Sequence, residues 1–152
     1  MTVTLRPAAE GDAERLLTWR NDPETRRRAF TTEEVSPDEH RAWLARRLAD
    51  PATALFIAED DGEPVGQVRL DREAGNVGVV SIAVAPEARG RGLASVLLDA
   101  LAAHPGLGVS RLRAEVKPDN ERSLRAFVRS GYREVGRDER AVVLERTLEG
   151  RL

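Results

Sequence analysis

The chain has 152 residues, of which 41% are hydrophobic and 33% are charged, and it contains no cysteine. A chain of this length can enclose one hydrophobic core, so we expect a single domain over residues 1–152. Without cysteine, disulfide bonds, thiolate metal sites and a cysteine nucleophile are excluded. A formal net charge of -2 argues against nucleic acid as a partner, because proteins that bind nucleic acids usually carry an excess of basic side chains.

The N-terminal residues lack the basic and apolar stretches of a secretory signal. No window approaches the ~18 to 20 consecutive apolar residues that a membrane span requires. We therefore expect a cytoplasmic protein without a membrane partner.

The first third of the chain predicts one strand and two helices. Alternation over Val3 to Arg6 predicts a strand, and Asp12 can cap the helix that follows it. Asn21-Asp22-Pro23 ends this helix. The Arg-rich stretch from Glu24 to Val35 has no clear period and predicts a loop or a frayed helix. Ser36-Pro37 is typical of a helix start and predicts the second helix.

Three strands follow in the middle of the chain. Ala54 to Ala58 and Val65 to Leu70 flank the turn Asp61-Gly62 and predict a hairpin. Val77 to Val84 is the most apolar stretch, and we expect it at the centre of the sheet with both faces buried.

The last third alternates between helices and strands. A helix begins near Leu93, a strand runs from Leu112 to Val116, and a second helix follows Asn120 and ends before Gly131. Two further strands complete the order β-α-α-β-β-β-α-β-α-β-β.

A glycine-rich turn, Arg89-Gly90-Arg91-Gly92, joins the apolar strand to the next helix. Such a turn exposes backbone N–H groups beside the positive end of a helix dipole, which suits a phosphate or pyrophosphate. A tight strand-to-helix connection without a ligand explains the same glycines. A Walker loop is excluded because no Gly-Lys-Ser/Thr follows, and Ser95 replaces the third glycine of a dinucleotide fingerprint.

A second strand-to-helix junction carries Asn120 and Ser123. Asn120 is also a good helix N-cap and Gly131 a good C-terminal residue, so helix punctuation alone explains both. The combination is more informative, because two consecutive junctions place polar donors at the same edge of one sheet.

Together these motifs resemble the GCN5-related N-acetyltransferase family. Residues 89–94 match the family's pyrophosphate loop, and Asn120, Ser123, Gly131 and Tyr132 match its later pattern, 30 residues on. The resemblance implies an α/β (α+β) fold: a mixed, mostly antiparallel seven-stranded sheet with splayed central parallel strands and about four helices. It also implies acetyl-CoA as the acetyl donor and a primary amine as the acceptor, with no metal.

The resemblance assigns a cofactor site. The pantetheine arm would pair with the backbone of Ile82, Ala83 and Val84, and Asn120 and Ser123 would contact it. The pyrophosphate would be bound by the N–H groups of Arg89, Gly90, Arg91, Gly92, Leu93 and Ala94.

The catalytic acid and base depart from the family pattern. Phe127 occupies the position at which many members have a tyrosine that acts as the catalytic acid, so Ser123 is the candidate acid. Val79 occupies the usual glutamate position, and Glu115 becomes the candidate base, with a solvated strand face as the alternative. Deprotonation through ordered water also remains open. Further candidate bases are Glu33, Glu34 and His40, although His40 also fits a helix surface.

The N-terminal sequence resembles acetyltransferases of amino-sugar nucleotides of the pseudaminic-acid type, and also ribosomal-protein N-terminal acetyltransferases. The cluster Arg26-Arg27-Arg28, with Phe30, would then bind the acceptor, for example at a diphosphate. A solvated basic face explains the cluster equally well. A non-catalytic CoA-binding module and a dinucleotide-binding protein remain alternatives, and we expect a monomer or a homodimer.

Overall fold

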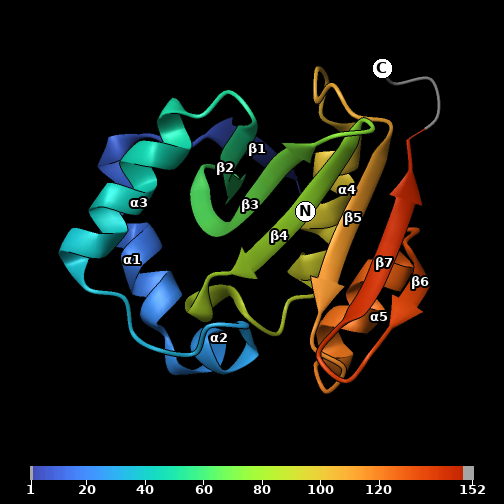
Figure 1. Ribbon diagram of the computed structural model, residues 1–152. Coiled ribbons are helices and arrows are strands. Elements are labelled where there is room, and N and C mark those ends of the chain that lie inside the picture. The colour runs from blue at the N-terminus through green and yellow to red at the C-terminus, as the bar shows by residue number, and fades with distance from the viewer. Residues whose placement is uncertain (1, 149–152) are drawn as a thin grey trace.

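The computed structural model describes residues 2–148 (Figure 1). Seven strands form one sheet: β1 (Val3–Pro7), β2 (Thr53–Asp60), β3 (Glu63–Glu73), β4 (Val77–Val84), β5 (Arg111–Val116), β6 (Arg133–Arg137) and β7 (Val142–Thr147). Five α-helices accompany them in this part of the chain: α1 (Ala13–Asn21), α2 (Pro23–Arg28), α3 (Pro37–Ala49), α4 (Leu93–Ala103) and α5 (Glu121–Arg129). Two short 3-10 turns, Glu10–Asp12 and Pro86–Ala88, precede α1 and α4.

The strands lie in the order β1-β2-β3-β4-β5-β7-β6, so the most apolar strand, β4, is central as expected. All neighbouring strands are antiparallel except β4 and β5. Helix α4 packs on β1, β3 and β4 with α5 beside it, whereas α1, α2 and α3 gather on the side of β2 (Figure 1). The mixed, mostly antiparallel sheet of the α/β fold is confirmed.

The central parallel pair separates soon after it forms. Pairing between β4 and β5 runs only from Val77 opposite Arg111 to Val79 opposite Arg113. Beyond these residues the two strands diverge (Figure 1). The predicted splay is confirmed, but β4 is not buried on both faces throughout, because Ser81 to Val84 have lost their neighbour and are half-buried.

A close approach of α4 to the sheet sets the position of this gap. A methyl group on Gly66 of β3 would lie 2.8 Å from Leu97 Cδ2, nearer than side chains tolerate. Glycine therefore lets α4 pack directly on β3, where Leu97, Leu98 and Leu101 are fully buried. The N-terminal end of α4 is thereby fixed at the end of β4.

The segment after α1 adopts the helical one of the two forms that the sequence left open. Helix α1 ends at Asn21 as expected, and the Arg-rich stretch, predicted as a loop or a frayed helix, begins with a helix, α2. The Asp22 carboxylate accepts the Thr25 N–H, and Pro23 occupies the first helical turn, where its missing N–H costs nothing. A proline that ends one helix therefore begins the next, which gives five helices instead of about four.

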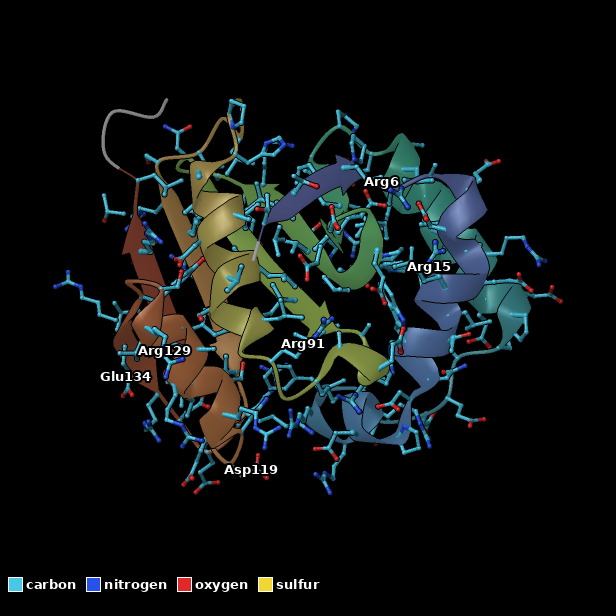
Figure 2. All side chains as sticks on the ribbon, turned by 180° about the vertical axis from the view of Figure 1, so that it is seen from behind. Arg6, Arg15, Arg91, Asp119, Arg129 and Glu134 are labelled. Carbon is cyan, nitrogen blue, oxygen red and sulfur yellow. The ribbon has the colours of Figure 1, made fainter. Side chains whose placement is uncertain are left out.

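Asp12 also has a different role from the predicted helix cap. Its side chain makes no cap bond to α1 and instead accepts from the Ala9 N–H and from the guanidinium groups of Arg6 and Arg15. Arg6 and Arg15 approach one another from β1 and α1 (Figure 2). Hydrogen bonding by Arg6 holds the pKa of the buried Asp12 carboxyl below its usual value.

Within residues 2–148, no helix has the length and apolar character to cross a membrane. The same residues contain no group of three or more His, Cys, Asp or Glu side chains that could hold a metal ion.

Candidate active site

The edge of β4 that faces the gap offers unpaired backbone groups. Ala85 N–H donates to Val65 C=O on β3 (2.8 Å). Residues of an antiparallel pair direct their backbone groups alternately toward the partner and away from it. Ala83 therefore bonds to β3, whereas Ile82 and Val84 direct their N–H and C=O groups into the gap. An extended chain with amide groups can pair with these two residues as an added strand would.

The turn after β4 forms a shallow cradle of amide donors. Gly90 and Gly92 have φ angles of 82° and 68°, and a methyl group on either would meet no atom within 4 Å. No carbonyl of the described residues accepts the N–H groups of Gly90, Gly92, Leu93 and Ala94. Because α4 begins at Leu93, its free amides and positive dipole end face the same space. The cradle can therefore bind a pyrophosphate.

The two arginines of this turn behave differently. The Arg89 N–H donates to Pro86 C=O, and its guanidinium donates to the Asp22 carboxylate (2.5 Å) and to the Thr25 hydroxyl (2.9 Å). Arg89 therefore ties the turn to α2 rather than lining the cradle. Arg91 is 3.9 Å from Asp60 and largely exposed, so its charge is available to an anion.

The second junction lies at the same end of the sheet, because β4 and β5 run parallel into their turns. Figure 2 shows Arg91 and Asp119 on the two neighbouring turns. Asn120 Oδ1 accepts the Ser123 N–H (3.3 Å), which is the predicted helix cap. Its amide N–H groups and the Ser123 hydroxyl have no partner among the described residues.

The aromatic positions of the second motif belong to the core. Phe127 and Tyr132 are buried and meet edge to face, with ring centroids 4.9 Å apart. The Tyr132 hydroxyl is buried without a hydrogen-bond partner, and burial raises its pKa. Tyr132 packs just before β6 and is a poor proton donor.

The candidate bases lie in different surroundings. Glu115 is exposed on the face of β5 that α4 and α5 leave open, the same face as Val79 and Ser81 of β4. It forms no ion pair within residues 2–148. Glu33 and Glu34 are exposed in the loop between α2 and α3.

His40 differs from the sequence prediction, because it is buried and does not lie on a helix surface. Its ring centroid lies 5.4 Å from that of Trp43. Burial, and then the charge of Arg20, lower the His40 pKa. His40 and the apolar Leu44 are the two residues of α3 whose side chains are buried.

The three arginines of the cluster Arg26-Arg27-Arg28 differ in their ion pairs. Arg27 and Arg28 both pair with Glu24, at 2.6 Å and 2.7 Å. Arg26 forms no ion pair among the described residues, and its Nε atom is buried without a partner. Phe30 is partly exposed.

Two contacts that the sequence did not predict join α2 and the loop after it to the far side of the gap. Lys117, at the end of β5, donates to the Arg27 carbonyl (3.1 Å), and the Arg140 guanidinium lies 4.3 Å from the centre of the Phe30 ring. No local sequence pattern distinguishes Lys117 or Arg140 from the other basic residues of this Arg-rich chain. Helix α2 consequently bridges the diverging strands near the two turns.

A sheet that opens at its parallel pair, with amide donors at the open end, can hold a ligand that combines an extended amide arm with a diphosphate, as coenzyme A does. Residues 2–133 match the family model described as "Acetyltransferase (GNAT) domain". The chain belongs to this family and is an acetyl-CoA-dependent N-acetyltransferase.

Individual relatives agree with this assignment. A phosphinothricin N-acetyltransferase of Streptomyces coelicolor is 33% identical over 150 residues, which cover 88% of this chain and 84% of the relative. The spermidine N-acetyltransferase of Vibrio cholerae, solved with CoA and spermine, is 20% identical with a TM-score of 0.87, covering 96% of this chain and 95% of that one. AAC(6')-Ib, solved with ribostamycin and coenzyme A, is 22% identical with a TM-score of 0.84, covering 97% and 94%. The two solved structures share the fold of this chain.

Acetyl-CoA fits the residues present. The unpaired edge at Ile82 and Val84 matches the amides of a pantetheine arm, and the open space at Gly90 and Gly92 leaves room for a diphosphate to approach the backbone.

Proposed function

We propose that the protein transfers the acetyl group of acetyl-CoA directly to the primary amine of a small molecule. The observation that carries this proposal is the coincidence of two features at one end of the sheet: the unpaired β4 edge and the amide cradle before α4. A donor held by both would present its thioester at the gap, next to the open face of β5.

The individual roles follow from this placement. Ile82 and Val84 hold the donor's arm through their backbone groups, with the Asn120 amide beside it. The amides of Gly90, Gly92, Leu93 and Ala94 bind the diphosphate, with Arg91 as an additional charge. Arg89 supports the cradle through Asp22 and Thr25 instead of touching the ligand.

Acetyl transfer requires an unprotonated amine and a proton for the departing thiolate. The amine nitrogen forms the new C–N bond, the C–S bond breaks, and the amine loses one proton while the thiolate gains one. We assign Glu115, which is exposed on the open face, as the group that accepts the proton of the amine, directly or through water. We assign the Ser123 hydroxyl at the neighbouring turn as the donor of the second proton; Ser123 then regains a proton from water, and Glu115 returns its proton to water.

The acceptor proposal is a nucleotide-linked amino sugar, with the N-terminal amine of a ribosomal-type protein as the alternative. The S. coelicolor relative is named for phosphinothricin, a small amino acid. This name favours a small molecule over a protein and makes phosphinothricin an acceptor to test first.

The experiment incubates the full chain with acetyl-CoA and a set of amines and measures free thiol. The set contains phosphinothricin, a UDP-linked 4-amino sugar, spermidine and a peptide with a free N-terminus. Release of thiol with one small amine, together with the acetylated product, supports the proposal. Release with the peptide alone supports the alternative, and no release with any amine contradicts both.

A further inference from the structure

The corner formed by α1, α2 and the following loop contains two guanidinium groups with no acidic partner. Arg20 Nη2 donates to the Thr31 carbonyl (2.8 Å), but its Nη1 atom is buried without a hydrogen bond. Arg26 Nε is buried and unbonded in the same way. Within residues 2–148 neither side chain forms an ion pair.

The two carboxylates next to and within α2 are occupied elsewhere. Asp22 accepts from Arg89 and from the start of α2, and Glu24 pairs with Arg27 and Arg28. The corner is also held in shape, because the Asn21 side chain bonds to both the N–H and the C=O of Val35 at 2.8 Å. Glu33 and Glu34 of the same loop are exposed, and neither forms an ion pair with Arg20 or Arg26 within residues 2–148.

This arrangement is unfavourable in the free protein. A buried N–H group without an acceptor loses its hydrogen bonds to water and gains none in return. Burial, and then the charge of Arg26, lower the pKa of Arg20, which shows that the two cations repel one another. A ligand that carries negative charge and several acceptor oxygens would satisfy both groups.

We propose that Arg20 and Arg26 form a binding site for an oxyanion carried by the acceptor molecule: a carboxylate, phosphinate or phosphate. This inference rests on the proposed function, because it assigns the substrate class of the same site. Arginine suits such a group, since its planar fork matches two oxygens of a carboxylate or phosphate.

The position of α2 supports this assignment. Helix α2 carries Arg26 and is tied to the turn after β4 through Arg89 and to the turn after β5 through Lys117. Figure 1 shows α2 near the end of β4, where the gap opens, so an anion held by this helix would lie close to the donor site. Arg27 and Arg28, which both pair with Glu24, take no part.

The test compares Arg26→Gln with Arg27→Gln, a matched control on the same helix whose guanidinium is 73% exposed. The acceptors are phosphinothricin, which offers a carboxylate and a phosphinate, the UDP-linked 4-amino sugar, which offers a diphosphate, and spermidine, which has no acid group. We expect Arg26→Gln to raise KM for the acidic acceptors by about ten- to a hundredfold, the loss of a hydrogen bond to a charged group. KM for acetyl-CoA and for spermidine should stay unchanged, and Arg27→Gln should change none of them.

The preference of the wild type between the two acidic acceptors identifies the source of the anion, and either preference supports the proposal. Equal effects of the two substitutions, or equal changes for acidic and non-acidic acceptors, overturn it.

Two further measurements separate this inference from the proposed function. Calorimetric titration of the CoA-bound protein with phosphinothricin and with the UDP-linked amino sugar measures binding without turnover. If no amine is acetylated, weaker binding to Arg26→Gln than to Arg27→Gln still supports the anion site, and equal binding overturns it. The melting temperature of Arg26→Gln should stay unchanged or rise, because an unpaired buried cation is removed; a fall of several degrees would indicate a structural role and overturn the proposal.

Discussion

Tyr132 shows how a motif residue can serve the core and not the chemistry. It occupies the aromatic position of the second motif, but its side chain is 3% exposed and its hydroxyl has no partner. A hydroxyl in this state adds the cost of its own desolvation to the folded protein. The ring contributes to the core by packing against Phe127.

We therefore expect Tyr132→Phe to leave kcat unchanged and to leave the free energy of unfolding unchanged or raised by up to about 1 kcal/mol. Urea denaturation and steady-state kinetics measure both quantities. Phe127→Leu serves as the packing control and should cost about 1 kcal/mol. A large fall in kcat for Tyr132→Phe would mean that the hydroxyl takes part in proton transfer.

His40 gives the folded protein a pH dependence of known sign. The unfolded chain binds a proton at this residue below a pH of about 6.5, whereas burial and the Arg20 charge lower the pKa in the folded state. Stability is therefore complete above that pH and falls as the pH drops toward the lower folded pKa. The slope can reach about 1.4 kcal/mol per pH unit.

Melting temperatures between pH 7 and pH 5 test this dependence. His40→Gln removes the titrating group, so its curve should be flatter than that of the wild type over this range. The carboxylates and His104 are common to both proteins and cancel in the comparison. Parallel curves for the two proteins would show that His40 titrates in the folded state as it does in the unfolded chain.

At the scale of elements, the turn before α4 can be tested apart from its backbone conformation. Gly92 and Gly75 both have positive φ, at 68° and 80°, and neither has an atom within 4 Å of an added methyl group. Alanine at either position should therefore cost about 1 kcal/mol of stability through the same backbone strain. Gly75 lies in the β3–β4 turn, away from the cradle.

Only Gly92→Ala should impair the ligand. A methyl group at the cradle keeps a diphosphate from the amides, and we expect the Kd for CoA to rise about tenfold, which corresponds to one lost hydrogen bond. Isothermal titration calorimetry of both variants measures this Kd. An equal rise in the Kd for CoA in Gly75→Ala would show that the effect comes from general destabilisation and not from the cradle.

Elements defined by local signals were predictable from the sequence. The apolar strand β4 and the Ser36 cap, whose hydroxyl accepts the Glu39 N–H, are examples. For α2 the sequence could not decide between a loop and a frayed helix, because a six-residue helix gains little stability from its own sequence. Its Asp22 cap is held by Arg89, 67 residues away in the chain.

The candidate site likewise contains residues that the sequence identified and residues that it did not. The glycine turn carries its own backbone preference and was identified from the sequence. The unpaired state of Arg20 and Arg26 depends on which acids the fold leaves within reach, and a composition with 24 basic and 26 acidic residues does not reveal that. For Asn120 the sequence could not separate a cap from a ligand, and the structure shows the cap while leaving its amide N–H groups available.

At the scale of the whole molecule, the gap divides one sheet into two parts that share a short parallel ladder. Strands β1 to β4 are continuous on one side, and β5, β7 and β6 on the other. Contacts between the two parts also run from α4 to α5, from α2 to Lys117, and from Phe30 in the loop after α2 to Arg140. A ligand that fills the gap would add a third connection and should stabilise the protein in proportion to its binding.

The backbone alternation along β4 makes this prediction specific to single amides. Ile82 and Val84 direct their N–H groups into the gap, whereas the Ala83 N–H is bonded to β3. In hydrogen exchange followed by NMR, Ile82 and Val84 should exchange fast in the free protein and slow down when CoA is added. Ala83 should be protected in both states, because its partner on β3 does not depend on the ligand. Protection that rises equally at all three residues would indicate a general tightening of the fold, and no change at Ile82 and Val84 would place the arm of the donor elsewhere.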